Sequence, residues 1–267
     1  MNKGILSAFH NGILTSTSLM PNGDSFDDAC QLALENPDLS VGVHISLVGE
    51  KALLPYSKTN NFISEDNMLP SSYTEFMKDL LLNKFPLSQI KDEIFAQVQK
   101  VIDAGIKPTH IDSHQHLHAY PKLFEIFTQA AKEFDIKTIR IPFEQNGVNM
   151  SRYSFRGLQL FILKTLASKA RVIAKKSGLN YADHFWGIGM SGNINEDNLL
   201  ETIKILKIGV NEIMCHPGIS DKVLRKKYQW GYSWDDELNA LQSENVKAAL
   251  KCYNIILSNF NEAFIHL

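Results

Sequence analysis

Strand-like and helix-like segments alternate along most of this chain, and the alternation limits the folds open to it. Residues 40–47 (SVGVHISL) form an apolar, β-branched run typical of a buried strand, and helical spacing recurs from Ile90 to Ile102. Further strand-like runs lie at residues 136–142, 182–188, 210–214 and 255–257. Such alternation predicts an α/β fold with a largely parallel sheet. Because the 267 residues contain no internal repeat or low-complexity linker, we expect one domain over residues 1–267.

The first elements depart from this order. Residues 2–11 have a helical pattern, and residues 13–20 (ILTSTSLM) have the pattern of the strand that follows it. A βα chain normally opens with a strand, so the pattern predicts either an unusual fold or a missing first strand. Loss of a central parallel strand exposes the backbone groups of its neighbours. We therefore expect the chain to fold poorly, or to close the gap with another chain, as in a homodimer.

Charge and cysteine content disfavour several classes of function. The 27 basic and 29 acidic residues nearly balance, which disfavours nucleic acid as a partner. The 3 cysteines form no CxxC pair, so we expect neither a disulfide framework nor a cysteine-based zinc site, as suits a reducing compartment. We expect no signal peptide and no transmembrane segment, and we predict a soluble, cytoplasmic protein.

The segment from His110 to His118 (HIDSHQHLH) holds four of the nine histidines, together with Asp112. These five residues stand at even positions, so an extended backbone would direct them to one side. Imidazole is the commonest metal ligand, and a neighbouring carboxylate can orient a ligating ring. The alternative is a polar strand end whose histidines only form hydrogen bonds. We favour a metal or catalytic site, and spacing alone leaves open which histidines bind the metal.

Two more histidines lie at predicted strand ends, where βα enzymes gather catalytic groups. His44 lies in the strand 40–47 and, taken alone, is better explained as a core residue than as a metal ligand. His216, in the turn IMCHPG, is either a proton donor to a leaving amine or a turn residue without a chemical role. Arg140 ends the run 136–142 and suits a substrate oxygen as well as a structural ion pair. We expect three residues to bind substrate or to support the metal ligands, namely Asp112, His116 and Arg140.

Two acidic runs receive no catalytic role. Asp27-Asp28 and Asp235-Asp236, the second followed by Glu237, stand where predicted helices begin. Acidic side chains there interact favourably with the positive end of the helix dipole. Residues 49–72 form a weakly patterned loop longer than most loops in compact domains, and such loops are often lids or substrate walls.

Four motifs, in this order along the chain, resemble the YdjC-like carbohydrate deacetylases, a group that includes the chitooligosaccharide deacetylases. The motifs are GILTSTSLMPNG, GVHISL, KPTHIDSHQHLH and EIMCHPG. The stretch ADHFWGIGMSGNINEDNLL looks more like the branch associated with hopanoid-lipid biosynthesis. The resemblance implies an irregular (β/α) barrel and a divalent metal, Mg²⁺ or Zn²⁺, held by one aspartate and two histidines. Those histidines match His44 and His114 here, and the matching general acid is His216.

The resemblance also identifies one departure from the family. An Ala-Asp-Asp-Phe-Gly segment that ends the first strand of the family supplies the aspartate ligand and the base, and this sequence does not contain it. In the family, that segment lies just before the stretch that matches residues 1–5. Its absence coincides with the missing strand inferred from the order of elements.

The function implied is metal-dependent hydrolysis of the N-acetyl group of an amino sugar or a glycolipid headgroup. Two alternatives stay open. One is a catalytically impaired or non-enzymatic remnant, because the Asp-Asp segment is absent. The other is a metal-dependent phosphoesterase or isomerase on the same barrel, since such barrels host both chemistries. A phosphate site would need extra basic residues or a glycine-rich turn at strand ends, and neither is clear in the sequence.

Overall fold

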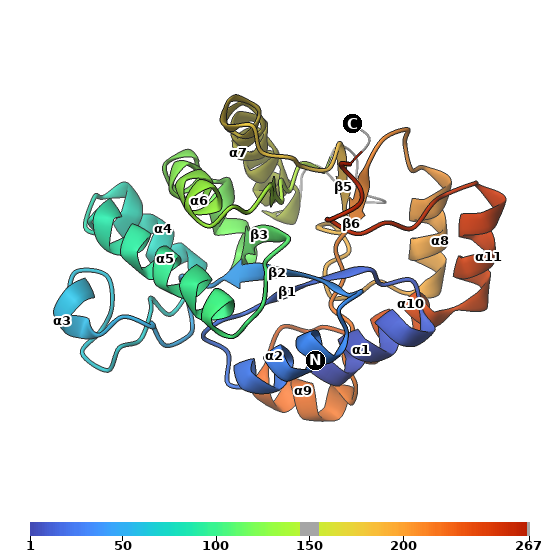
Figure 1. Ribbon diagram of the computed structural model, residues 1–267, viewed down its shortest axis with the longest axis horizontal. Coiled ribbons are helices and arrows are strands. Elements are labelled where there is room, and N and C mark those ends of the chain that lie inside the picture. The colour runs from blue at the N-terminus through green and yellow to red at the C-terminus, as the bar shows by residue number, and fades with distance from the viewer. Residues whose placement is uncertain (145–154, 266–267) are drawn as a thin grey trace. The chain divides into compact units, whose positions relative to one another are not determined.

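The protein is described by a computed structural model that covers residues 1–144 and 155–265. Its helices are α1 (Asn2–Asn11), α2 (Phe26–Glu35), α3 (Tyr56–Thr59), α4 (Tyr73–Leu81), α5 (Leu87–Asp103), α6 (Pro121–Glu133), α7 (Phe155–Ser177), α8 (Glu196–Lys204), α9 (Asp221–Lys227), α10 (Trp234–Gln242) and α11 (Glu244–Cys252). Its strands are β1 (Ser16–Leu19), β2 (Ser40–Ile45), β3 (His110–Ser113), β4 (Thr138–Ile139), β5 (His184–Trp186) and β6 (Asn211–Ile213), and a 3₁₀ helix (His114–Ala119) follows β3. Figure 1 shows that helices and strands alternate along much of the chain, as the sequence predicts.

The chain divides into two compact units, each made of segments that are distant in sequence. The first unit comprises Met1–Thr17, Ile141–Ser168 and Ala182–Leu267, and the second comprises Ser18–Arg140 and Lys169–Tyr181. A single domain over residues 1–267 therefore stays a prediction.

The four-stranded sheet has the order β1-β2-β3-β4, which follows the sequence. Strand β3 is parallel to both of its neighbours, and its register with β2 places Asp112 beside His44. Register partners on adjacent strands project to the same face of a sheet, so this pairing directs both polar side chains to one side. The register is therefore what brings a strand histidine and a strand aspartate into contact.

Helices α5 and α6 pack against each other and against this sheet (Figure 1). Four residues of α5 are completely buried at helical spacing, namely Ile90, Ile94, Val98 and Val101. Burial of each such side chain contributes roughly 1.5–3 kcal/mol relative to exposure. The strands are apolar as well, with Val43, Ile45 and Ile111 all completely buried. A parallel sheet needs this composition because helices cover it.

The long loop after β2 is tied to α5 by a buried polar pair. The carboxylate of Glu93, fully buried, accepts the backbone N–H groups of Leu53 at 2.9 Å and Leu54 at 3.0 Å. Gln97, one turn further along α5, donates to Glu93 at 2.9 Å and pairs with the backbone of Ser46. These bonds hold the beginning of the loop close to the end of β2. Its predicted role as a lid or substrate wall stays a prediction.

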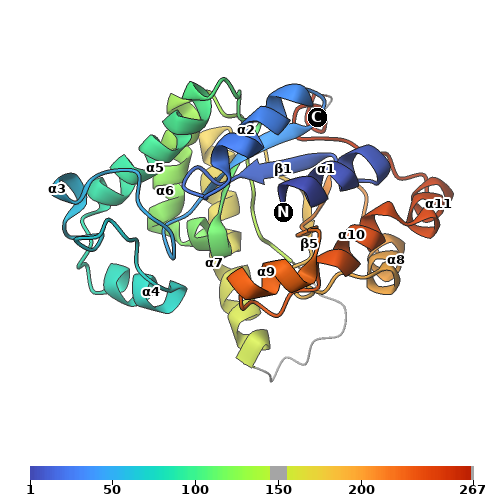
Figure 2. The same ribbon diagram turned by 90° about the horizontal axis from the view of Figure 1, so that it is seen from below.

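In the first unit, β5 and β6 pair in parallel, and α1, α8, α10 and α11 pack around one hydrophobic cluster (Figure 2). The buried residues of α1 are Gly4 and Ala8, four positions apart and so on one side of the helix. A Cβ atom on Gly4 would lie 2.6 Å from the Cα atom of Gly218. The small residues thus allow α1 to approach the turn that contains His216.

The predicted helix over residues 2–11 and the strand after it are confirmed as α1 and β1. The predicted strand at residues 255–257 is wrong. The backbone N–H of Ile255 instead bonds the Leu250 carbonyl at 2.9 Å and closes the end of α11, while Ile256 is 88% exposed. An α/β fold with parallel pairing is confirmed. The closed barrel, the missing first strand and the homodimer stay predictions.

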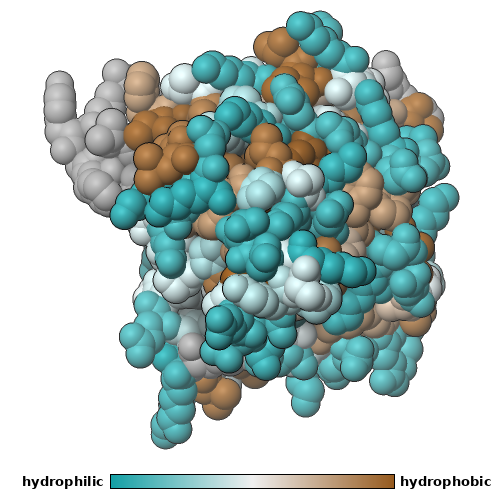
Figure 3. Space-filling model, turned by 90° about the vertical axis from the view of Figure 1, so that its left-hand side faces the viewer, coloured by the Kyte–Doolittle hydropathy of each residue, from teal (hydrophilic) through white to brown (hydrophobic). Residues whose placement is uncertain are grey.

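The surface shown in Figure 3 has hydrophobic patches between larger hydrophilic areas. In residues 1–144 and 155–265, no helix has the length and apolar character needed to cross a membrane.

The buried pair on α5 generates a prediction about stability. We expect Glu93→Ala to lower the free energy of unfolding by about 2–4 kcal/mol, because two buried N–H groups and Gln97 lose their acceptor. Asp92→Ala, at the exposed neighbouring position, should cost less than about 0.5 kcal/mol. Urea denaturation measures both. Equal losses in the two variants would show that Glu93 does not hold the loop.

Candidate active site

Asp112 lies at the centre of a buried polar cluster in the second unit. Its Oδ1 atom accepts a hydrogen bond from Nδ1 of His44 at 2.8 Å. Its Oδ2 atom accepts from the hydroxyl of Ser18 at 3.2 Å and forms an ion pair with Nη1 of Arg140. Burial alone would raise the pKa of Asp112, but the Arg140 guanidinium and His44 hold it well below its usual range. Asp112 is therefore a buried, ionised carboxylate.

The rings of His44 and His114 lie close to each other. Because Asp112 engages Nδ1 of His44, Nε2 is the ring nitrogen that His44 presents to a ligand. The ring centroids of His44 and His114 are 5.8 Å apart, at an angle of 75°. With metal–nitrogen bonds of about 2.1 Å, two imidazole ligands of one ion have centroids roughly 4.6–5.6 Å apart at ligand angles of about 90–120°. The two rings lie slightly farther apart than this, so a shared divalent cation would require them to approach each other.

The pair presents two imidazole side chains. Across residues 1–144 and 155–265, no group of three or more His, Cys, Asp or Glu side chains is arranged to hold a metal. A catalytic zinc usually has three protein ligands. The predicted metal site therefore stays a prediction.

His118 has a structural role. Its Nε2 atom lies 3.0 Å from the backbone carbonyl of Arg140, so Nε2 carries the proton and donates it. Its Nδ1 atom then accepts from the hydroxyl of Ser113 at 2.6 Å. Burial lowers the pKa of His118 to about 4, so the ring is neutral at pH 7. It connects the turn after β3 to the end of β4.

His110 is also structural. The Ser18 hydroxyl donates to Asp112 and so accepts from Nε2 of His110 at 2.9 Å. The His110 ring packs on Gly42, where a Cβ atom would come within 2.5 Å of it. Burial lowers the pKa of His110 to about 3. This neutral ring supports Ser18, which in turn supports Asp112.

The expectation that all five polar residues of the histidine-rich segment share one side is wrong. The strand ends at Ser113, and the chain turns through Gln115 and His116, whose φ angles are 54° and 55°. Two consecutive non-glycine residues in the left-handed region are uncommon and cost free energy. The turn carries His114 toward His44, while burial holds the pKa of His116 well below its ordinary value. A substrate contact for His116 stays a prediction.

His216 belongs to the first unit, where Glu237 of α10 holds its backbone. Oε2 of Glu237 accepts the His216 N–H, and Oε1 accepts the Ile194 N–H at 3.3 Å. The His216 Nδ1 atom lies 4.0 Å from Oε2 of Glu237, and its ring centroid lies 5.2 Å from that of Tyr232. Burial raises the pKa of Glu237 to about 7.

Two residues of these clusters were missed or misread from the sequence. Asp235 and Asp236 lie in the first turn of α10, as predicted, whereas Glu237, the next residue, received no role of its own from the sequence although its side chain is completely buried. The sequence feature that predicts this burial is the position of Glu237 on the apolar side of α10, between Trp234 and Leu241 at helical spacing. Ser18 had no signal beyond its position in a strand. Arg140 forms the ion pair that was one of its two interpretations.

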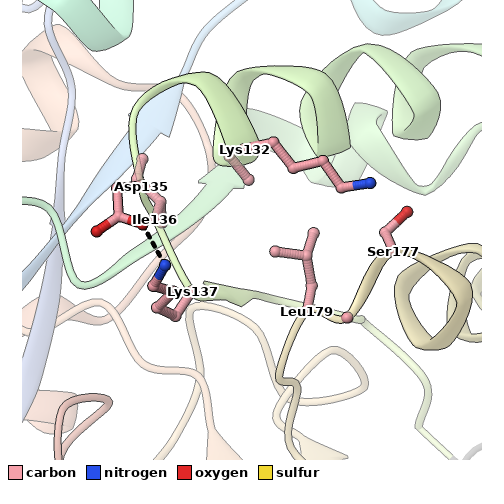
Figure 4. Close-up of a pocket in the computed structure, with 8 residues that line it drawn as sticks. Lys132, Asp135, Ile136, Lys137, Ser177 and Leu179 are labelled. Atoms are coloured by element: carbon pink, nitrogen blue, oxygen red, sulfur yellow. Dashed lines mark hydrogen bonds and ion pairs between the residues drawn. The ribbon is translucent and has the colours of Figure 1, made fainter.

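A pocket of the second unit lies away from these histidines. It is lined by residues at the carboxyl ends of α6 and α7, including Lys132, Asp135, Lys137 and Ser177 (Figure 4). Asp135 and Lys137 form an ion pair across its edge. None of its lining residues is a histidine, so this pocket is not the candidate active site.

The Asp112 cluster generates a prediction that tests its charge. We expect Asp112→Asn to lower the free energy of unfolding by about 3–5 kcal/mol, because it leaves Arg140 buried without its counterion. The lowered pKa means that this stabilisation is present above the ordinary aspartate range and is lost as the pH falls below it. Asp135→Asn, in an exposed ion pair, should cost less than about 1 kcal/mol. Similar losses in both variants at pH 7 would contradict the cluster.

Glu237 generates a prediction in which the free energy of unfolding falls as the pH rises, the opposite of the dependence expected for Asp112. Its raised pKa means that the folded state holds the proton more tightly than the unfolded chain. The free energy of unfolding should therefore fall by about 3 kcal/mol as the pH rises from about 4.5 to about 7. Glu237→Gln removes this loss, so the variant gains stability relative to the wild type over that range. Denaturation at several pH values measures the difference, with Glu133→Gln as the exposed control. A constant difference would rule out the raised pKa.

Comparison with known proteins places the chain in a family. Residues 1–252 match the family described as YdjC-like protein. A carbohydrate deacetylase of Clostridium beijerinckii is 30% identical over 269 residues, covering 98% of this chain and 94% of that protein. A chitooligosaccharide deacetylase of Salmonella typhimurium is 30% identical over 258 residues, covering 93% of this chain and 88% of that protein.

A solved structure shares the fold. A crystal structure from Enterococcus faecalis, described as a proposed cellobiose-phosphate cleavage protein, matches with a TM-score of 0.74 and 25% identity, over 97% of this chain and 92% of that chain. The resemblance carried by the four sequence motifs is thus confirmed over nearly the whole chain. The chain belongs to the YdjC-like protein family.

Proposed function

We propose that this protein is a metal-dependent hydrolase that removes the N-acetyl group from an amino sugar or from the sugar headgroup of a glycolipid. The observation that carries the proposal is the His44–His114 pair, with its 5.8 Å ring separation and with His44 oriented by a buried carboxylate. The names of the relatives from Clostridium beijerinckii and Salmonella typhimurium support the same reaction class. The products are acetate and a free amino sugar.

A divalent cation, Mg²⁺ or Zn²⁺, would be held by Nε2 of His44 and by the ring of His114. Such a cation polarises the acetamide carbonyl and lowers the pKa of a bound water. Imidazole ligation suits zinc, and the aspartate that the family resemblance adds would suit either metal. Asp112 acts by orienting His44, because both of its oxygens are engaged by His44, Ser18 and Arg140. It is a positioning residue and not the base.

His216 is the proposed proton donor to the departing amine. The His216 side chain is 28% exposed, and Glu237 accepts a hydrogen bond from the His216 backbone N–H. The backbone position is therefore fixed, while the side chain can still reach a substrate. Glu237 accepts its hydrogen bond from the backbone of His216. This differs from His44, in which one nitrogen is committed to a carboxylate.

A second candidate is a catalytically impaired remnant. One observation favours it: within residues 1–144 and 155–265, no group of three or more His, Cys, Asp or Glu side chains is arranged to hold a metal. Activity separates the two candidates. Acetate release from N-acetylglucosamine or its β-1,4-linked oligomers, after loading with Zn²⁺ or Mg²⁺, supports the hydrolase. No release from any of these sugars contradicts the hydrolase and supports the remnant.

The metal pair generates a prediction with a readout besides activity. We expect His44→Ala and His114→Ala each to lower the affinity for Zn²⁺ by at least about 100-fold, because each removes a ligand. Equilibrium dialysis with metal analysis measures this loss, and acetate release should fall in parallel. His10→Ala, an exposed histidine of α1, is the matched control and should change neither quantity. Undiminished zinc affinity in both ligand variants would exclude the proposed metal site.

A further inference from the structure

Four aromatic residues follow one another at alternate positions in the segment that leads into α10, namely Tyr228, Trp230, Tyr232 and Trp234, the last being the first residue of that helix. Their rings are in sequential contact. The centroid separations are 4.5 Å for Tyr228–Trp230, 5.6 Å for Trp230–Tyr232 and 5.7 Å for Tyr232–Trp234. Residues 228–234 therefore form a continuous row of aromatic rings, here called the aromatic row.

The inner end of the aromatic row is rigid. The Tyr232 hydroxyl lies 2.9 Å from the hydroxyl of Ser191, and a Cβ atom on Gly192 would come within 2.0 Å of the Tyr232 ring. The Ser233 N–H donates to the Gly192 carbonyl at 2.7 Å. The ring thus packs directly against a glycine backbone, and its position is defined on three sides.

The aromatic row extends from the surface to His216. Trp230 is 45% exposed, whereas Trp234 is completely buried. Between them, the Tyr232 ring lies 5.2 Å from the ring of His216. An exposed indole is thus connected through one tyrosine to the proposed proton donor.

We infer that the aromatic row is a binding platform for a sugar ring next to the acetylated one. A pyranose ring has an apolar face of C–H groups and a rim of hydroxyls. Large aromatic side chains bury such a face with little loss of conformational entropy, and tyrosine hydroxyls can bond the rim. This inference rests on the proposed function, because the platform leads to the residue proposed to protonate the amine.

The four side chains of the aromatic row carry no charge. Arg225, the basic residue that bonds the Tyr232 carbonyl at 3.4 Å, is paired with Asp221 at 2.8 Å. The aromatic row itself contributes no charge, and Gln229 and Gly231 occupy the intervening exposed positions. Stacking and hydrogen bonding are therefore the interactions that the side chains of the row itself offer.

Trp230 allows binding to be measured without turnover. It is the exposed tryptophan of the chain, since Trp186 is 5% exposed and Trp234 is 0% exposed. Titration of the full chain with the β-1,4-linked trimer of N-acetylglucosamine should therefore change the tryptophan fluorescence. We expect the trimer to bind about tenfold more tightly than the monomer. Trp230→Ala should remove this preference, and Trp230→Phe should restore most of it when binding is followed by calorimetry.

Tyr253→Ala is the matched control, because Tyr253 is 49% exposed on the same unit and lies outside the aromatic row. It should leave the preference for the trimer unchanged. An equal trimer affinity in the wild type and Trp230→Ala would overturn the inference. So would self-association that Trp230→Ala abolishes, because the indole would then be buried between two copies.

Kinetics separate this inference from the proposed function. If the trimer binds through Trp230 and no acetate is released, the deacetylase fails and the platform stands. If acetate is released and Trp230→Ala keeps the wild-type ratio of trimer to monomer affinity, the platform is excluded and the deacetylase proposal stands. When both hold, Trp230→Ala should raise KM for the trimer about tenfold and leave kcat/KM for the monomer unchanged.

Discussion

The buried carboxylate of Asp112 is the interaction on which the candidate metal site depends. It contacts Ser18 of β1, His44 of β2 and Arg140, which directly follows β4, while Asp112 itself belongs to β3. A single anion thus connects the ends of all four strands of the sheet. Removal of one partner of such a buried pair is costly, because the remaining charge has no solvent to stabilise it. The orientation of the His44 ring and the register of the strands are consequently maintained by the same contacts.

The histidine-rich segment divides its residues between structure and chemistry. His110 and His118 are neutral and buried, and both act through hydrogen bonds to hydroxyl or carbonyl groups. His118 bonds the backbone of the residue whose guanidinium pairs with Asp112, so the turn after β3 and the ion pair are coupled. That coupling offsets the cost of two left-handed residues in the turn. The turn brings the ring of His114 close to the ring of His44.

Each unit positions a candidate histidine with a buried carboxylate, but the two carboxylates differ in charge. Asp112 has a guanidinium beside it and stays ionised, and it holds a ring nitrogen. Glu237 accepts backbone N–H groups, and burial raises its pKa toward neutrality. The first arrangement orients an imidazole and makes one nitrogen a better ligand. The second holds the main chain of His216.

The sequence by itself determined the βα order, the opening helix and the family, because apolar periodicity and motif order are local properties of the chain. It did not separate the four histidines of residues 110–118, which are chemically identical. Their roles follow from where β3 ends and from which partners lie within hydrogen-bonding distance. Only the tertiary structure decided that Glu237 is buried, because three consecutive acidic residues look alike until α10 packs one side of itself into the core.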